Sequence, residues 1–212
     1  MELELDILKE NQRLALENKR RLESRKILAI DVMGSVGSGK TSLIKAMVQR
    51  LKHRFRIAVI EGDVTTTIDS ELIASEGVPT VQVNTGKECH LDANLIRKAL
   101  DRMALETLDL IFIENVGNLI CPAEFPLGSD KRLVVISVTE GPYMVLKHPM
   151  MFLDASAVAI NKVDLASAMD VDPRKLASDV ARLNPKAKAV GTSCKNGVGI
   201  DDVLVALHLK EP

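Results

Sequence analysis

The stretch Gly34-Ser35-Val36-Gly37-Ser38-Gly39-Lys40-Thr41 decides the fold of this chain. It matches the pattern GxxxxGK[ST] and lies between the apolar run of residues 26–33 and residues 42–51, which have the pattern of a helix. Glycines at these spacings let consecutive backbone N–H groups turn inward around phosphate oxygens, and the following helix adds the positive end of its dipole. The stretch therefore predicts a phosphate-binding loop between a strand and a helix.

Further short aliphatic runs follow this loop along the chain, covering residues 56–60, 80–83, 108–114, 132–138, 155–160 and 187–190. Near-continuous runs of Val, Ile and Leu are typical of strands that are covered on both faces. Helical patterns separate most of them, for example at residues 91–106 and 200–209. The alternation predicts an α/β fold with a doubly wound, mostly parallel sheet of about seven strands, whose ligands lie at the carboxyl ends of the strands.

The N-terminal segment has a different character. Residues 2–24 contain neither Gly nor Pro and carry a narrow apolar stripe among charged residues, which predicts a helix. We therefore expect two parts, an N-terminal helix within residues 1–25 and a nucleotide-binding domain over residues 26–212.

Composition limits the classes of function. The 212 residues are 46% hydrophobic and 27% charged, as in a globular protein, and the net charge of -1 gives no reason to expect nucleic acid or a membrane surface as a partner. No apolar run approaches the roughly 20 residues that span a bilayer, and the N-terminus lacks the pattern of a signal peptide. Because there are only 3 cysteines, we expect a reducing compartment, the cytoplasm.

The loop itself supplies the first candidate site residues, which are Gly34, Ser35, Val36, Gly37, Ser38, Gly39, Lys40, Thr41 and Ser42. Lys40 is expected to reach the β- and γ-phosphates, and the hydroxyl of Thr41 is expected to ligand magnesium. A Gly-rich turn without a ligand is the alternative interpretation of the pattern.

A second motif indicates the base. Asn161-Lys162-Val163-Asp164 (NKVD) follows the apolar run of residues 155–160. A carboxylate at Asp164 can accept the N1–H and N2–H of guanine, whereas adenine offers no matching pair of donors. Asn161 and the stem of Lys162 can contact other parts of the base. Thr192-Ser193-Cys194-Lys195 resembles the base-capping loop of GTPases, which adds Ser193, Cys194 and Lys195 to the candidates, with Cys194 as an inert thiol.

Hydrolysis also needs carboxylates that hold magnesium or its water ligands. Glu114 ends the apolar run of residues 108–114, where such an acid is expected, and Asp63 follows the second run. An exposed strand-end acid and an ordinary Gly-Asp turn are the respective alternatives. With Lys40 and Thr41, these two acids form the expected catalytic set of a GTPase.

Cysteine and histidine residues suggest a second metal site. Cys89 and His90 precede the helical pattern of residues 91–106, and Cys121 lies seven residues after Glu114. Thiolates and imidazole suit zinc or nickel better than magnesium. Three ligands do not complete a tetrahedral site, which a second copy of the chain could complete. Two unrelated buried cysteines and a histidine that caps the helix are the alternative.

Four stretches together resemble the HypB family, the GTPases of hydrogenase nickel incorporation: GSVGSGKT at residues 34–41, ECHLDA at 88–93, ENVGNLICP at 114–122 and NKVD at 161–164. The resemblance covers nearly all of the chain after residue 25. It implies a cytoplasmic GTPase that supplies nickel to the large subunit of nickel–iron hydrogenase. It also implies that Cys89, His90 and Cys121 form a zinc or nickel site at the interface of a homodimer promoted by GTP.

The resemblance further implies a small nickel-chaperone partner, for which the N-terminal helix is a plausible docking element. The chain departs from some relatives in two respects. Residues 1–30 contain neither Cys nor His, which argues against an N-terminal nickel-binding cluster or a storage tract, and Asn94 stands where some relatives have a second histidine.

Three alternatives remain from the sequence. A urease accessory GTPase has a similar plan, but its Cys-Pro-His triplet is absent from this chain. A P-loop kinase acting on a small molecule is opposed by the NKVD motif. A metal-binding scaffold with a structural nucleotide would bind GTP without turnover.

Overall fold

The computed structural model describes residues 2–63, 72–86 and 90–211. In these residues, seven strands form one sheet in the order β3-β2-β4-β1-β5-β6-β7, and every pairing is parallel. The strands are β1 (Leu28–Met33), β2 (Ile57–Asp63), β3 (Thr80–Asn84), β4 (Leu110–Glu114), β5 (Lys131–Ser137), β6 (Ala157–Asn161) and β7 (Lys188–Gly191). The expected doubly wound α/β fold is confirmed.

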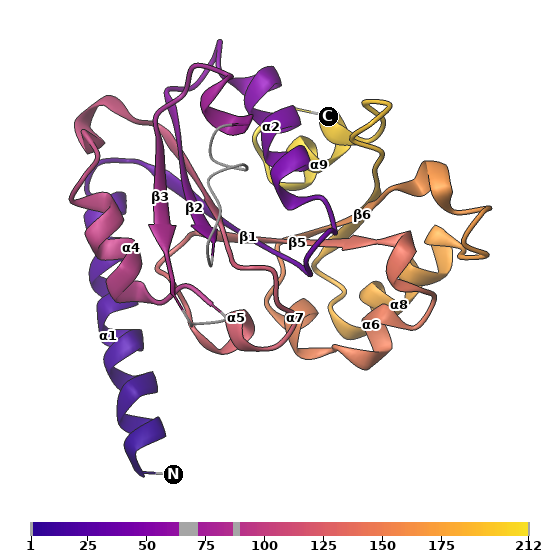
Figure 1. Ribbon diagram of the computed structural model, residues 1–212, viewed down its shortest axis with the longest axis horizontal. Coiled ribbons are helices and arrows are strands. Elements are labelled where there is room, and N and C mark those ends of the chain that lie inside the picture. Colours follow the sequence, from indigo (N-terminus) through magenta and orange to yellow (C-terminus); the bar gives the residue numbers. More distant parts are fainter. Residues whose placement is uncertain (1, 64–71, 87–89, 212) are drawn as a thin grey trace.

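Helices cover both faces of the sheet (Figure 1). One face carries α2 (Lys40–Leu51) and α9 (Ile200–Ala206), while α4 (Ala93–Leu100), α6 (Met144–Lys147), α7 (Met150–Leu153) and α8 (Pro173–Leu183) lie on the other. Short elements complete the chain: α5 (Cys121–Glu124) and the 3-10 turns η1 (Leu105–Thr107), η2 (Val138–Glu140) and η3 (Val163–Leu165). Because both faces are covered, the central strands are apolar on both sides.

Successive side chains of each strand point to opposite faces of the sheet, so the core consists of separate clusters on the two faces. On β1, Ile30 and Val32 face the cluster built on α2 and α9, whereas Ala29 faces the cluster built on α4. A third cluster joins β5 and β6 to α6, α7 and α8. Packing on both faces fixes the register of the sheet, and the carboxyl ends of β1, β2, β4 and β6 therefore meet along one edge.

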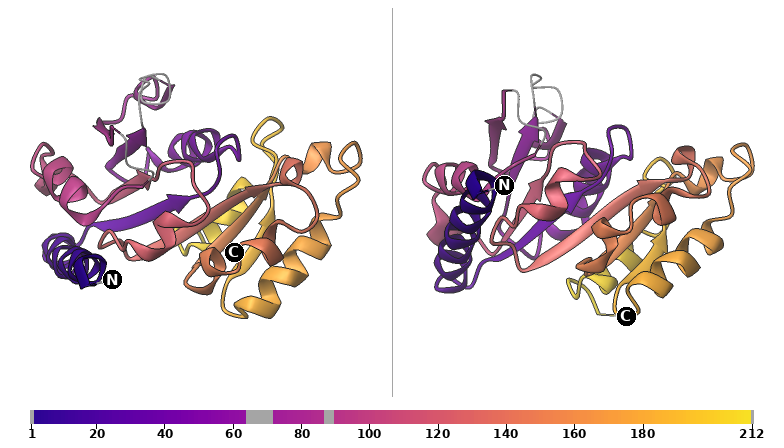
Figure 2. Two further views of the ribbon diagram at one scale, coloured as in Figure 1. Left: turned by 60° about the horizontal axis from the view of Figure 1, so that its bottom comes forward. Right: turned by 90° about the horizontal axis from the view of Figure 1, so that it is seen from below.

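The N-terminal helix α1 (Glu2–Glu23) runs beside α4 (Figure 2). Leu14, Ala15 and Leu22 are buried against the domain, whereas Ile7 is exposed where the first turns of the helix extend beyond it. Arg21 pairs with Asp101 at 2.6 Å. The second half of the helix is thus packed on the domain.

The helix expected over residues 91–106 is shorter in the structure. It begins at Ala93, after Asp92, whose carboxylate accepts a hydrogen bond from the N–H of Leu95 at 2.7 Å. It ends at Leu100, because the chain must turn back to enter β4, and residues Leu105–Thr107 form a separate 3-10 turn. Of the apolar positions that predict this helix, Leu95 and Ala99 lie in α4, whereas Leu91 precedes it and Met103 follows it. Within the described residues, no helix has the length and apolar character that crossing a bilayer requires.

Candidate functional site

The phosphate-binding loop closes around its own lysine. The ammonium of Lys40 donates hydrogen bonds to the carbonyl oxygens of Gly34 at 3.3 Å and Ser35 at 3.2 Å. Lys40 is also the first residue of α2, so the charge lies at the positive end of that helix. A loop that places a cation at a helix N-terminus has the features that bind an anion.

Asn161 joins this loop to the NKVD segment. Its Nδ2 donates to the carbonyl oxygen of Ser38 at 2.9 Å, and its Oδ1 accepts from the hydroxyl of Thr192 at 3.2 Å and the N–H of Cys194 at 3.4 Å. Gly39 has φ 96°, and a Cβ at this position would lie 2.3 Å from Nδ2 of Asn161. The loop approaches Asn161 so closely that only glycine fits there.

A pocket of about 530 Å³ opens beside Asn161. Residues from four separate segments line it: Gly39, Thr41, Ser42, Lys45, Ala46 and Gln49 from the loop and α2; Leu72; Asn161, Lys162, Asp164 and Leu165 after β6; and Cys194 and Lys195 after β7. The structure thus brings Asp164, Cys194 and Lys195 together, as expected for a base pocket. Ser193 is buried, and its hydroxyl accepts from the N–H of Asn196 at 3.3 Å, which shapes the loop.

A second pocket, of about 380 Å³, shares Gly39, Thr41 and Ser42 with the first. Here the hydroxyl of Thr41 donates to Oε1 of Glu114 at 2.7 Å. Glu114 is only 5% exposed, so the alternative of an exposed strand-end acid is wrong. The pocket also takes in Lys40 and continues along the ends of β2 and β4.

Glu61 is a carboxylate that the sequence interpretation missed. It is 1% exposed, is the register partner of Glu114 on the neighbouring strand, and lines the same pocket. Asp63 ends β2, and its side chain lies outside the described part of the structure. The available signal was the period of two in a strand, since Glu61 and Asp63 share one face.

Two ionisable groups near the nucleotide pockets, Glu140 and Cys194, have raised pKa values. Burial raises the pKa of Glu140, which lies close enough to Lys162 and Lys40 for their charges to oppose the shift. Lys162 donates to the carbonyl oxygen of Gly37 at 2.7 Å, which ties NKVD to the loop a second time. Burial also raises the pKa of the Cys194 thiol, which disfavours the reactive thiolate, and Cys194 lines the first pocket.

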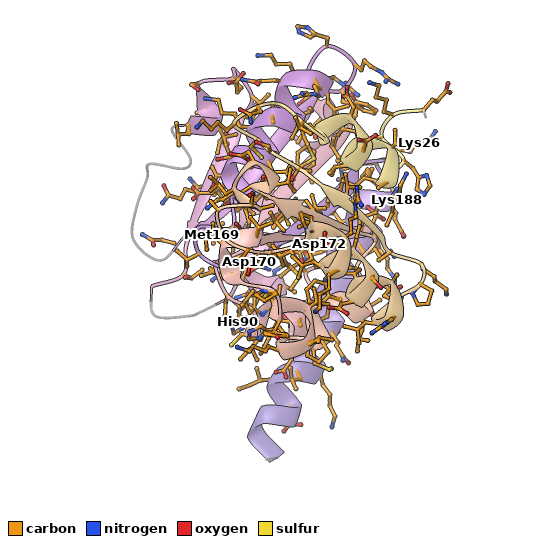
Figure 3. The ribbon with its side chains drawn as sticks, turned by 90° about the vertical axis from the view of Figure 1, so that its right-hand side faces the viewer. Lys26, His90, Met169, Asp170, Asp172 and Lys188 are labelled. Atoms are coloured by element: carbon orange, nitrogen blue, oxygen red, sulfur yellow. The ribbon has the colours of Figure 1, made fainter. Side chains whose placement is uncertain are left out.

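The cysteine–histidine residues lie on two segments. His90 stacks on Phe125, with ring centroids 3.9 Å apart, and Cys121 opens the short helix that precedes Phe125. Figure 3 shows His90 on the side of the molecule opposite Lys26 and Lys188, which mark the amino ends of β1 and β7. His90 therefore lies at the edge where the strands end. Asp92, not His90, caps α4, which contradicts the alternative of a capping histidine.

Cys89 lies outside the described residues, and among those described no three His, Cys, Asp or Glu side chains are grouped closely enough to hold a metal ion. Two asparagines of α1 nevertheless join the segments that follow His90 and Cys121. Asn11 accepts from the N–H of Ala93 at 2.8 Å and donates to the carbonyl oxygen of Pro126 at 2.9 Å. Asn18 donates to the carbonyl oxygens of Ala93 at 2.8 Å and Leu127 at 3.1 Å.

Comparison with known proteins identifies the domain. Residues 28–191 match the profile of the nucleotide-binding domain described as CobW/HypB/UreG. The chain is 48% identical over 204 residues to the probable hydrogenase maturation factor HypB of Methanocaldococcus jannaschii, covering 96% of this chain and 92% of the relative. It is 44% identical over 204 residues to hydrogenase maturation factor HypB of Escherichia coli, covering 96% of this chain and 70% of the relative.

Solved structures agree with the sequence relatives. Hydrogenase maturation factor HypB from Archaeoglobus fulgidus superposes with a TM-score of 0.88 at 41% identity, covering 94% of this chain and 98% of that chain. HypB from Helicobacter pylori, solved in complex with nickel, superposes with a TM-score of 0.88 at 36% identity, covering 95% and 94%. The family match over residues 28–191 includes the phosphate-binding loop, the NKVD segment, His90 and Cys121.

Proposed function

Since the chain belongs to the HypB family of hydrogenase maturation factors, within the CobW/HypB/UreG nucleotide-binding proteins, we propose that it is a GTPase that delivers nickel to nickel–iron hydrogenase. One observation carries the proposal: Asn161 of NKVD is hydrogen-bonded both to the phosphate-binding loop and to the loop of Cys194. The groups that bind phosphate and the groups that read the base therefore form one connected site.

Guanine is the base that this pocket favours. Asp164 lines the larger pocket together with Lys162, Cys194 and Lys195. A carboxylate accepts two parallel donors, which guanine has and adenine lacks. A site built to hydrogen-bond one base rejects another strongly, because the unmatched polar groups are left buried without partners.

The smaller pocket fits magnesium. Its donors are oxygen atoms, the hydroxyl of Thr41 and the carboxylates of Glu114 and Glu61, and hard cations prefer such ligands. Magnesium is commonly held by one or two carboxylates together with substrate phosphates. In our proposal Thr41 and Glu114, with Asp63 at the end of β2, hold the ion or its water ligands. Bound magnesium would neutralise the charge that develops on the phosphates during hydrolysis.

Nickel is the cargo, and Cys89, His90 and Cys121 are the proposed ligands, with zinc as the competing metal. Thiolate and imidazole donors suit both ions. The Helicobacter pylori relative was solved in complex with nickel, which supports nickel as the metal. Because three ligands leave a site incomplete, we propose that a GTP-promoted homodimer brings two such sets together. The exposed first turns of α1 are the proposed dock for a nickel-chaperone partner in the cytoplasm, and the hydrogenase large subunit receives the metal directly or indirectly.

The test combines turnover and metal binding. The purified protein is incubated with magnesium and either GTP or ATP, and the release of phosphate is measured. Nickel binding is measured by titration in parallel. We expect the chain to hydrolyse GTP but not ATP. We also expect saturable nickel binding that is lost in Cys121→Ala. Lys40→Ala should abolish tight GTP binding and turnover, because the phosphates lose their cation. Preference for ATP would instead indicate a kinase, and GTP binding without any turnover would indicate a scaffold.

A further inference from the structure

Leu91 follows His90 directly and is fixed at two points on the sheet edge. Its side chain is fully buried and lies against Gly62 of β2, where an added Cβ would lie 2.7 Å from a methyl group of Leu91. Its N–H donates to Oδ1 of Asn115 at 3.1 Å. The position of His90 is therefore set by contacts with the ends of β2 and β4.

Asn115 is the more informative of these contacts. It is 1% exposed and lines the smaller pocket. Its Oδ1 accepts from Leu91 and from Val116, at 3.1 and 3.0 Å, while Nδ2 donates to Oδ1 of Asp31 at 3.2 Å. Because two backbone N–H groups face one atom of the amide and a carboxylate faces the other, the orientation of the amide is determined.

The same residue is joined to the magnesium pocket. Asn115 directly follows Glu114, which accepts a hydrogen bond from the hydroxyl of Thr41 at 2.7 Å. The backbone N–H of Asn115 donates to the carbonyl oxygen of Val32 at 3.0 Å. When magnesium and the γ-phosphate enter or leave, the charge facing Glu114 changes. Leu91 cannot remain in place while the amide moves, since its buried N–H would then be left without an acceptor.

We propose that Asn115 is a positioning residue that couples the nucleotide state at Glu114 to the position of Leu91 and the adjoining His90, and through them to nickel affinity. The proposal rests on the proposed function. The contacts of Ala93 with α1 provide the contrast, because Asn11 and Asn18 tie this residue to a helix that touches neither pocket. Leu91 is therefore linked to the nucleotide pocket through Asn115, whereas Ala93 is linked to α1.

The experiment measures nickel affinity of the full chain with GDP and with a non-hydrolysable GTP analogue, magnesium being present throughout. For the wild type we expect the two affinities to differ by about 5- to 150-fold, the usual range of coupling between sites. Asn115→Ala should reduce this ratio to about one. Asn184→Ala is the matched control: Asn184 is also buried and bonded through its amide, to Phe152 and Ala155, but is remote from both pockets, and it should keep the wild-type ratio.

A second measurement needs no variant. Amide hydrogen exchange of wild-type Leu91 should differ between the two nucleotide states, whereas exchange of Ala93 should not. A wild-type chain that binds no nickel refutes the proposed function and this proposal with it. A nickel-binding wild type with equal affinities in the two states overturns the coupling alone. The coupling role of Asn115 is also overturned if the ratio persists in Asn115→Ala, or if Leu91 exchanges equally in both states.

Discussion

Truncation of Asn161 to alanine tests the connection between the two halves of the nucleotide site. Asn161 is 2% exposed, and its amide serves the buried carbonyl of Ser38, the buried hydroxyl of Thr192 and the N–H of Cys194. Each buried polar group left without a partner costs about 1–3 kcal/mol. Since the opened space admits water to part of the site, we expect Asn161→Ala to lower the free energy of unfolding by about 2–4 kcal/mol.

The assay is urea denaturation of the nucleotide-free chain, followed by far-ultraviolet circular dichroism, with GDP affinity measured by titration calorimetry. GDP affinity should fall at least tenfold, because each loss of about 1.4 kcal/mol in loop ordering and base contact is a factor of ten. Asn184→Ala should lose comparable stability and keep its GDP affinity. A free energy of unfolding for Asn161→Ala within about 0.5 kcal/mol of the wild-type value would be typical of a surface substitution. That result, or unchanged GDP affinity, would refute the connected site.

Three further changes separate recognition, chemistry and stability. Asp164→Asn should weaken GTP binding by several kcal/mol and shift preference toward xanthosine nucleotides, whose 2-oxo group meets an amide donor; unaltered GTP affinity would remove the guanine assignment. Glu114→Gln should keep more nucleotide affinity than turnover, and turnover at the wild-type rate would exclude this carboxylate from the magnesium site. Burial raises the pKa of Asp31 from 3.8 to about 6, so its contribution to stability is complete below pH 3.8 and is lost as the pH rises through about 6. Relative to Asp31→Asn, the wild type should therefore lose up to about 3 kcal/mol of unfolding free energy between pH 3.8 and pH 7, as measured by urea denaturation, and parallel pH profiles would contradict the assignment.

The parts of the site that were predictable from the sequence are those whose signal is local. The loop around Lys40 and the NKVD motif each lie within eight residues, and the flanking aliphatic runs predict the strands that carry them. The all-parallel sheet follows from the same alternation. Its strand order, in which β1 lies between β4 and β5, depends on long-range packing that no single segment encodes.

Contacts between distant segments could not be predicted in the same way. Asn161 and Ser38 are 123 residues apart, and Leu91 and Asn115 are 24 apart, so neither pair leaves a spacing pattern. The strand period of two places Glu61 on the same face as Asp63, but its position beside Glu114 depends on the register between β2 and β4, which the sequence does not show. The premature end of α4 has the same origin: the apolar stripe continues to Met103, but the path back to β4 overrides it.

The two asparagines of α1 give the N-terminal helix a mechanical role. Each bridges the chain after His90 to the chain after Cys121, and they are seven residues apart, about two helical turns. Because a helix is stiff along its axis, the exposed first turns of α1 are rigidly connected to these two asparagines. A partner that bound the free end of α1 would therefore be linked to both segments at once through Asn11 and Asn18, with no contact of its own to either.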